Sequence, residues 1–192
     1  DVYKRQGMAE AIQKYAAAGG TVMGLCGGFQ MLGNILADPE GIEGYEGRYK
    51  ALELLPMRTV ITRHKIARQR QVTSNYPQLG LPITGYEIHQ GRTQLTKPEG
   101  DEAGGKSFRT LFDDPSLGVV DESLSVWGAY LHGIFDNGPW RRAWLNRLRQ
   151  QRGLQALPTG IANYREHREM VLDELANTVQ AQLKLDPIIS QF

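Results

Sequence analysis

Residues 21–33 read TVMGLCGGFQMLG and place the only cysteine of the chain, Cys26, in a glycine-rich turn. The short apolar run before it, residues 21–25, predicts a buried strand, and the apolar spacing that resumes at Phe29 predicts a helix. The glycines that permit a tight turn between the two elements are Gly24, Gly27 and Gly28. A strand, a sharp turn and a helix in this order form a nucleophile elbow, which exposes the central side chain at the tip of a sheet.

Cys26 could be a buried core residue or a reactive nucleophile, and the elbow favours the nucleophile. A free cysteine is more often a buried and unreactive core residue than a nucleophile. Glycines on both sides argue against a core role, because they raise the entropy cost of folding without filling space. The positive end of the following helix would also favour the thiolate over the thiol. We therefore interpret Cys26 as a catalytic nucleophile.

Composition narrows the class of protein. The 192 residues carry 22 Lys and Arg against 21 Asp and Glu, and this balance gives no electrostatic argument for nucleic acid or an anionic membrane. A single cysteine excludes an internal disulfide and a thiolate cluster for zinc. The sequence has no apolar run of membrane-spanning length and no signal-peptide pattern. We expect a cytoplasmic protein with small-molecule or protein partners and no metal site of its own.

The start of the chain is unusual for a parallel α/β domain. Residues 1–6 have no element pattern, and a helix is expected at once, from about Met8 to Ala18. Domains of this class have strands before the nucleophile strand, so we expect the leading strands to be missing. The predicted organisation is a non-native or disordered start at residues 1–6, followed by one partial domain at residues 7–192.

Downstream, the alternation of residues predicts further strands. Residues 59–62 and 67–73 are expected to form a pair of strands whose many basic residues line either a solvated face or an anion-binding surface. Residues 84–89 predict a strand with Tyr86 and Ile88 on one face and Glu87 and His89 on the other. Residues 97–106 predict a surface loop. An apolar run at residues 125–131 predicts a strand that ends at His132.

The C-terminal third predicts helices. The spacing of Trp140 and Trp144 indicates an amphipathic helix with these aromatics in the core. A last helix is expected over about residues 163–183, and its apolar stripe is Val171, Leu175 and Val179.

Four histidines could serve Cys26 as a base. His64 and His167 lie in polar surroundings that predict exposed positions. His89 shares a face with Glu87, which predicts either a cross-strand polar pair or a pair that lines the site. His132 is the best candidate, because chemistry in open α/β sheets gathers at the C-terminal ends of strands.

Three motifs resemble a known family. Residues 24–30 (GLCGGFQ) match the G-x-C-x-G-x-Q elbow of class I glutamine amidotransferase domains, and residues 130–133 (YLHG) hold the histidine of their downstream motif. Together with residues 85–91 (GYEIHQG) and 128–137, they make the chain from Gly7 onward resemble the amidotransferase half of the cobyric acid synthases.

The resemblance implies a flavodoxin-like α/β domain with a mixed, mostly parallel sheet. It implies that Cys26 hydrolyses glutamine through a thioester, with His132 as acid and base and Gln30 in contact with the substrate. The N–H of Gly27, next to the nucleophile, is placed to stabilise the oxyanion. The ammonia would pass to a synthetase domain that is absent from this sequence. That domain uses ATP and Mg²⁺ to amidate carboxylates of adenosylcobyrinic acid a,c-diamide in cobalamin biosynthesis, whereas the amidotransferase domain needs no cofactor.

Two features depart from the family pattern. Class I domains carry a glutamate two residues after the histidine, and this chain has Ile134 there. Glu87 and Asp136 are candidates for the missing orienting group, and His89 is a further residue that could line the site. The glycine-containing loop that supplies a second oxyanion donor does not precede Met8.

Other functions stay open at this stage. The chain could be the glutaminase of a related amidotransferase, such as a cobyrinic acid a,c-diamide synthase or a complex that amidates a cell-wall lipid. It could also be a catalytically silent domain that only binds a synthetase.

Overall fold

The computed structural model describes residues 6–96 and 108–182 and divides the chain into two compact units, residues 1–134 and 135–192. The predicted surface loop at residues 97–106 and residues 1–5 of the predicted non-native start lie outside the described residues. No helix in the described ranges is long and apolar enough to cross a membrane.

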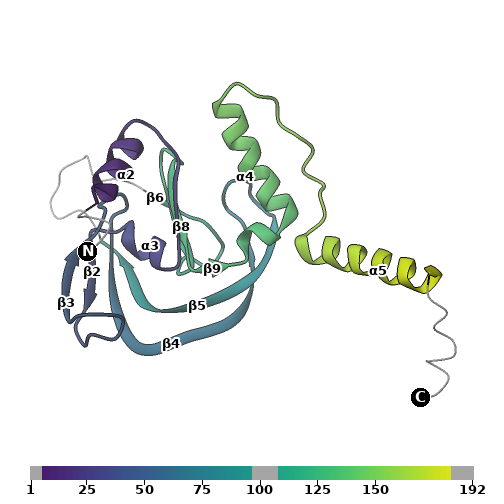
Figure 1. The fold of residues 1–192 in the computed structure, drawn as a ribbon. Coiled ribbons are helices and arrows are strands. Elements are labelled where there is room, and N and C mark those ends of the chain that lie inside the picture. The colour runs from purple at the N-terminus through teal and green to yellow at the C-terminus, as the bar shows by residue number, and fades with distance from the viewer. Residues whose placement is uncertain (1–5, 97–107, 183–192) are drawn as a thin grey trace, which may run out of the picture. The chain divides into compact units, whose positions relative to one another are not determined.

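The first unit combines two helices with short strands and one long hairpin (Figure 1). The helices are α2 (Met8–Ala17) and α3 (Gly27–Met31). The strands are β1 (Val22–Leu25), β2 (Ile35–Asp38), β3 (Gly47–Lys50), β4 (Met57–Thr73), β5 (Pro82–Leu95), β6 (Phe108–Thr110), β7 (Gly118–Asp121), β8 (Val126–Ala129) and β9 (Leu131–His132).

These strands form two mixed sheets, with the orders β1-β8-β7-β6 and β3-β2-β4-β5-β9. The prediction of mixed strand pairing is confirmed, but the expected single and mostly parallel sheet is wrong for the described residues, in which only β1 with β8 and β2 with β4 pair in parallel. The other five pairings are antiparallel. The physical reason is that short turns connect β4 with β5 and β7 with β8, and short turns can join only antiparallel neighbours.

The prediction of two paired strands at residues 59–62 and 67–73 is also wrong. Both segments belong to the single strand β4, and each pairs with β5. The register shifts between Ile61 and Ile66, so residues 62–65 form a bulge opposite Gln90. Figure 1 shows β4 and β5 running together as one long curved ribbon.

The two sheets are joined at Tyr130. β8 ends at Ala129 in the first sheet, and β9 begins at Leu131 in the second, so Tyr130 is the single residue between them. Its side chain is 1% exposed and packs edge-on against Phe29 of α3, with ring centroids 5.0 Å apart. Burial of large aromatic side chains here fixes α3 and both sheets around one core. Other fully buried residues of this core are Leu32, Leu55, Met57, Ile61, Ile83, Leu111, Phe112, Leu117 and Trp127.

The second unit contains α4 (Gly138–Gln151) and α5 (Tyr164–Gln182), after the 3-10 helix η1 (Ile134–Asp136). Trp140 is fully buried and Phe135 packs edge-on against both Trp140 and Trp144, which agrees with the predicted aromatic core. The Asn146 side chain exchanges two hydrogen bonds with the backbone of Leu157 and ties the following segment to α4. The predicted apolar stripe of α5 is exposed: Val171, Leu175 and Val179 are 48%, 58% and 39% exposed.

Candidate active site

The predicted elbow is confirmed by the backbone of residues 22–31. β1 ends at Leu25, Cys26 is the residue before α3, and Cys26 has φ 52° and ψ −113°. A residue with a side chain rarely adopts a positive φ, and such strain collects at functional sites. The turn therefore holds the cysteine in the conformation expected of an elbow nucleophile.

The glycines around Cys26 serve different purposes from the one predicted. The positive φ lies on Cys26 itself, whereas Gly24 is needed for close approach, because a Cβ there would lie 2.4 Å from the carbonyl oxygen of Gly28. A Cβ on Gly27 or Gly28 would meet no atom within 4 Å. The first turn of α3 therefore faces open space beside the nucleophile, and its leading N–H groups have no acceptor within the helix.

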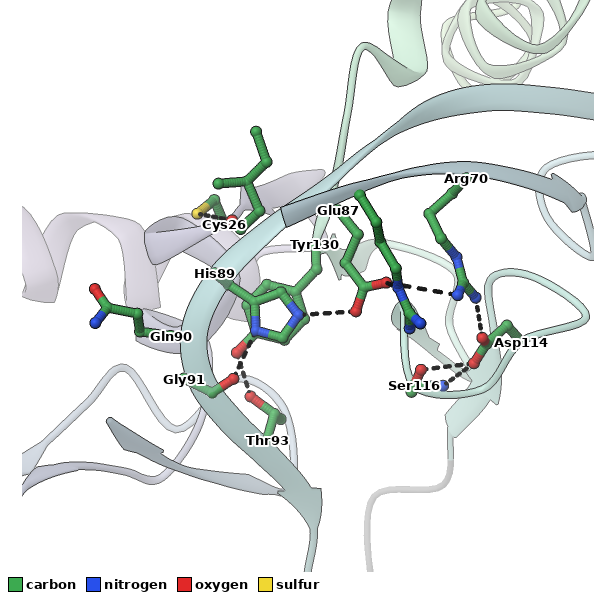
Figure 2. A network of polar contacts seen from close by, with 12 residues as sticks. Cys26, Arg70, Glu87, His89, Gln90, Gly91, Thr93, Asp114, Ser116 and Tyr130 are labelled. Atoms are coloured by element: carbon green, nitrogen blue, oxygen red, sulfur yellow. Dashed lines mark hydrogen bonds and ion pairs between the residues drawn. The ribbon is translucent and has the colours of Figure 1, made fainter. Parts of the chain in front are cut away.

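Two hydrogen bonds fix Cys26 between the sheets. Its backbone N–H donates to the carbonyl oxygen of Ala129, the last residue of β8, at 2.9 Å. Its Sγ donates to the carbonyl oxygen of Ile88 on β5 at 3.4 Å, the contact drawn at Cys26 in Figure 2. The nucleophile thus touches both the end of β8 in the first sheet and β5, an interior strand of the second.

His132 lies beside the same segment of β5. It lies on β9, directly opposite Tyr86 in an antiparallel pair. Its Nε2 is buried and has no hydrogen-bond partner among the described residues. The structure therefore brings Cys26 and His132 to one three-residue stretch of β5, from Tyr86 to Ile88.

Gln30 points into the interior. It is 4% exposed, and a Cβ on Gly91 would lie 2.4 Å from its Nε2, so Gly91 is the residue that leaves room for this side chain. Gln30 also hydrogen-bonds the phenol of Tyr130. The glycine at the end of the GYEIHQG motif is thus explained by packing against the elbow helix.

Figure 2 shows a network of polar side chains centred on Glu87 and His89. Glu87 is 2% exposed and accepts hydrogen bonds from Arg68 at 2.8 Å and from His89 Nε2 at 3.1 Å. Arg70 lies 3.6 Å from the same carboxylate and also binds Asp114. A buried carboxylate is tolerated here because cations surround it.

The network sets the charge of its members. Burial by itself would raise the pKa of Glu87, but hydrogen bonds from Arg68 and His89 and the charges of Arg68 and Arg70 outweigh it and lower that pKa below its ordinary value. His89 faces this ionised carboxylate with Nε2 and the carbonyl oxygen of Gly91, at 2.7 Å, with Nδ1. Both ring nitrogens of His89 are therefore engaged, one by the carboxylate and one by the backbone.

The imidazole of His89 stacks on Tyr130, with ring centroids 3.7 Å apart and planes at 13°. The Tyr130 hydroxyl lies 2.5 Å from that of Thr93, which in turn lies 2.7 Å from that of Thr59. Burial raises the pKa of Tyr130 despite these hydrogen bonds, so the residue remains a neutral phenol. Tyr130 thus links the polar network to the backbone that carries Ala129 and His132.

The strand register separates two of the predicted site residues. Tyr86 pairs with His132 and Glu87 pairs with Leu131, so the side chains of Glu87 and His132 lie on opposite faces of the second sheet. The register does not bring Glu87 to His132 as an orienting group. Asp136 is exposed on η1 in the second unit. His64 on the bulge and His167 on α5 are exposed, as predicted.

Sequence reasoning missed Arg68, Arg70, Asp114 and Tyr130 as parts of the site. The arginines were grouped with the solvated basic residues of β4, but Arg68 and Arg70 alternate onto the face that meets Glu87. Glu87 itself was the available signal, because a carboxylate on an inward face requires a cation nearby. In the ranges that the structure describes, no group of three or more His, Cys, Asp or Glu side chains could hold a metal ion.

Comparison with known families gives an independent view of the same residues. The family described as "CobB/CobQ-like glutamine amidotransferase domain" matches residues 1–140, which include Cys26, the GYEIHQG motif and His132.

Three similar proteins are all named cobyric acid synthase. The chain is 66% identical over 187 residues to a cobyric acid synthase of Nostoc punctiforme, which covers 97% of this chain and 37% of that protein. It is 57% identical over 189 residues to the cobyric acid synthase of Trichodesmium erythraeum, covering 98% of the chain and 37% of the relative. It is 54% identical over 187 residues to the cobyric acid synthase of Synechococcus elongatus, and the match covers 97% of this chain and 37% of that protein. The chain therefore spans little more than a third of the length of these relatives.

Proposed function

Because the chain belongs to the family of CobB/CobQ-like glutamine amidotransferase domains, we propose that it is the glutaminase part of a cobyric acid synthase. In this proposal, Cys26 and His132 release ammonia from glutamine. A synthetase part then uses ATP and Mg²⁺ to amidate side-chain carboxylates of adenosylcobyrinic acid a,c-diamide in the cytoplasm. The relatives' name and the length that they have beyond this chain support the second half of the proposal.

One observation carries the chemistry: a strained cysteine and a histidine with an unpartnered Nε2 meet the same stretch of β5. The Cys26 sulfur attacks the amide carbon of glutamine, and His132 accepts the thiol proton. His132 returns that proton to the amide nitrogen as the C–N bond breaks, and ammonia leaves. Water activated by His132 then cleaves the thioester to glutamate.

The start of α3 is suited to the oxyanion that forms in both steps. The Gly27 N–H follows the nucleophile directly, and a Cβ on Gly27 would meet no atom within 4 Å, so we assign this N–H as one oxyanion donor. A second donor would come from a loop of the longer protein. Gln30 would act from the interior, where its amide and the phenol of Tyr130 shape the floor beside substrate glutamine.

The Glu87 and His89 pair acts in our proposal as a positioning device. The stack of His89 on Tyr130 holds β5 against the connection between β8 and β9, and the hydrogen bond of His89 to Gly91 within β5 fixes the orientation of the ring. Cys26 and His132 both depend on these backbone segments.

The finer fold is also a proposal. β1 has β8 as its single neighbour among the described residues, so the other edge of β1 is unpaired. We propose that leading strands of the longer protein pair there and complete a flavodoxin-like, mixed sheet, with residues 7–192 as one partial amidotransferase domain. Unpaired edges are prone to aggregate, which gives such strands a physical role.

The test compares two nitrogen sources in the longer protein. Cys26→Ser should abolish amidation of adenosylcobyrinic acid a,c-diamide with glutamine but spare amidation with ammonium salts, because activation of the carboxylate does not need the thiol. A Cys26→Ser variant that still amidates the substrate with glutamine would refute the assignment of Cys26 as the nucleophile. A wild-type protein that releases no glutamate from glutamine would favour the catalytically silent alternative.

A further inference from the structure

Beyond the bulge, the two faces of the β4–β5 hairpin differ in the charge of their side chains. On one face, Arg68, Arg70, Glu87 and His89 turn toward the interior network. The other face, here called the neutral face, is made of Ala67, Gln69, Gln71, Thr73, Pro82, Thr84, Tyr86 and Ile88. All eight of these residues are exposed and none is charged, although Tyr86 and Ile88 are large apolar residues. The exposed face thus carries two large apolar side chains and no charge, whereas the opposite face holds the buried Glu87 together with the buried Val72 and Ile83, and Arg68 on that face is half exposed.

The neutral face is continuous with the nucleophile and the base. His132 pairs with Tyr86 and shares its face of the sheet, and the Cys26 thiol contacts the backbone of Ile88. Tyr86 is 52% exposed and Ile88 is 37% exposed, so both are accessible beside the place where ammonia is released. Any molecule that covers this face would also cover the exit from the site.

We propose that the neutral face is the docking surface for the ammonia-accepting, ATP-dependent part of the longer protein. This inference rests on the proposed glutaminase function. Ammonia that escapes into neutral water becomes ammonium, which lacks the lone pair needed to attack an activated carboxylate, so the acceptor must close over the exit. The relatives have almost two thirds of their length outside the part that matches this chain, which provides an occupant.

The chemistry of the face fits a buried interface. Neutral amides and hydroxyls lose much less hydration energy than charged groups when they are covered, and charged residues are depleted from interface centres. Tyrosine is enriched among the residues that contribute most to binding, and Tyr86 lies in the middle of the face. Exposed charges on the neighbouring bulge, Arg63 and Lys65, would lie at the rim.

The experiment places charge on the face at positions away from Cys26 and His132. The double variant Gln69→Glu with Gln71→Glu is made in the longer protein and assayed with glutamine, ATP, Mg²⁺ and adenosylcobyrinic acid a,c-diamide. The amount of amide formed per glutamate released should fall by about tenfold or more, because unpaired charges would be buried on docking. Glutamate release and amidation with ammonium salts should stay close to those of the unmodified protein.

Two controls separate docking from folding. Gln69→Asn with Gln71→Asn keeps the face neutral and should retain the normal ratio of amide to glutamate. Leu79→Asp places a charge at an exposed apolar residue outside the face and should also leave the ratio unchanged.

The outcomes distinguish this inference from the function on which it rests. An unchanged ratio in the Glu variant, with normal glutamate release, would overturn the docking inference and leave the glutaminase standing. No glutamate release by the unmodified protein would overturn the proposed function. An unchanged ratio together with a dimer of the unmodified protein that dissociates in the Glu variant would assign the face to a second copy and overturn the proposal.

Discussion

Replacement of Cys26 by glycine should remove activity and yet leave the fold more stable than replacement by alanine. Cys26 has φ 52° and ψ −113°, a region in which glycine is unstrained and a residue with a Cβ is not. Strain of this kind costs about 1 to 3 kcal/mol per residue. Alanine keeps the strain, whereas glycine removes it.

The size of the difference follows from two opposing terms. Relief of strain favours the glycine variant by about 2 kcal/mol, the middle of that range. The greater freedom of glycine in the unfolded chain opposes it by about 0.4 to 1 kcal/mol. Both variants lose the same thiol contact with Ile88, so this loss cancels in the comparison. The glycine variant should therefore be more stable than the alanine variant by about 1 kcal/mol.

Thermal unfolding followed by near-ultraviolet circular dichroism would measure this difference. For a chain of this size, 1 kcal/mol corresponds to a shift of about 2 to 4 °C in the melting temperature. An alanine variant that melts at the same temperature as the glycine variant, or above it, would refute the assignment of strain to the elbow. Glutaminase activity in either variant would refute the role of Cys26.

Further predictions concern the base, the packing, the pH dependence and the length of the chain. His132→Asn should lower glutaminase turnover at least about 10²-fold, the scale of a positioned acid–base group, and His89→Asn should lower it less; the reverse order in steady-state assays would reassign the base. Gly85→Ala would place a Cβ 2.4 Å from the carbonyl oxygen of His132, so it should lower both turnover and melting temperature, whereas Gly44→Ala meets no atom within 4 Å and should change neither. Because the folded pKa of Glu87 is lowered, the stability that it contributes is complete above the ordinary glutamate pKa of about 4.3 and is lost as the pH falls through the lower folded value. Urea unfolding between neutral and acid pH should therefore show a shallower loss of stability for Glu87→Gln than for the unmodified protein, and parallel curves would contradict the contribution of this ion network. Residues 1–192 produced alone should be poorly soluble and should hydrolyse glutamine more slowly than the longer protein, by about 10² to 10³ for one absent oxyanion donor; equal turnover by a soluble monomer would show that the second donor lies within the chain.

Local sequence determined the elbow and the helices. The apolar run before Cys26, the glycines around it and the apolar spacing after it predicted β1 and α3. These signals are local, because the periodicity of a strand or helix and the lack of a side chain at a turn depend on residues that are neighbours in the sequence. The boundaries of α2 and α5 were predicted to within a few residues for the same reason. The motifs also predicted the family, which the match over residues 1–140 confirms.

Tertiary structure alone decided which strands pair and which faces are buried. Alternation placed Glu87 and His89 opposite Tyr86 and Ile88, but it could not say which pair faces inward, since the usual rule would bury the apolar pair. Arg68 and Arg70 reverse that rule, because they neutralise Glu87 from a strand that is distant in sequence. The switch of the chain between sheets at Tyr130 likewise depends on pairings of β8 with β1 and of β9 with β5. Such long-range pairings bring Cys26 and His132 to one segment of β5, and no local pattern contains them.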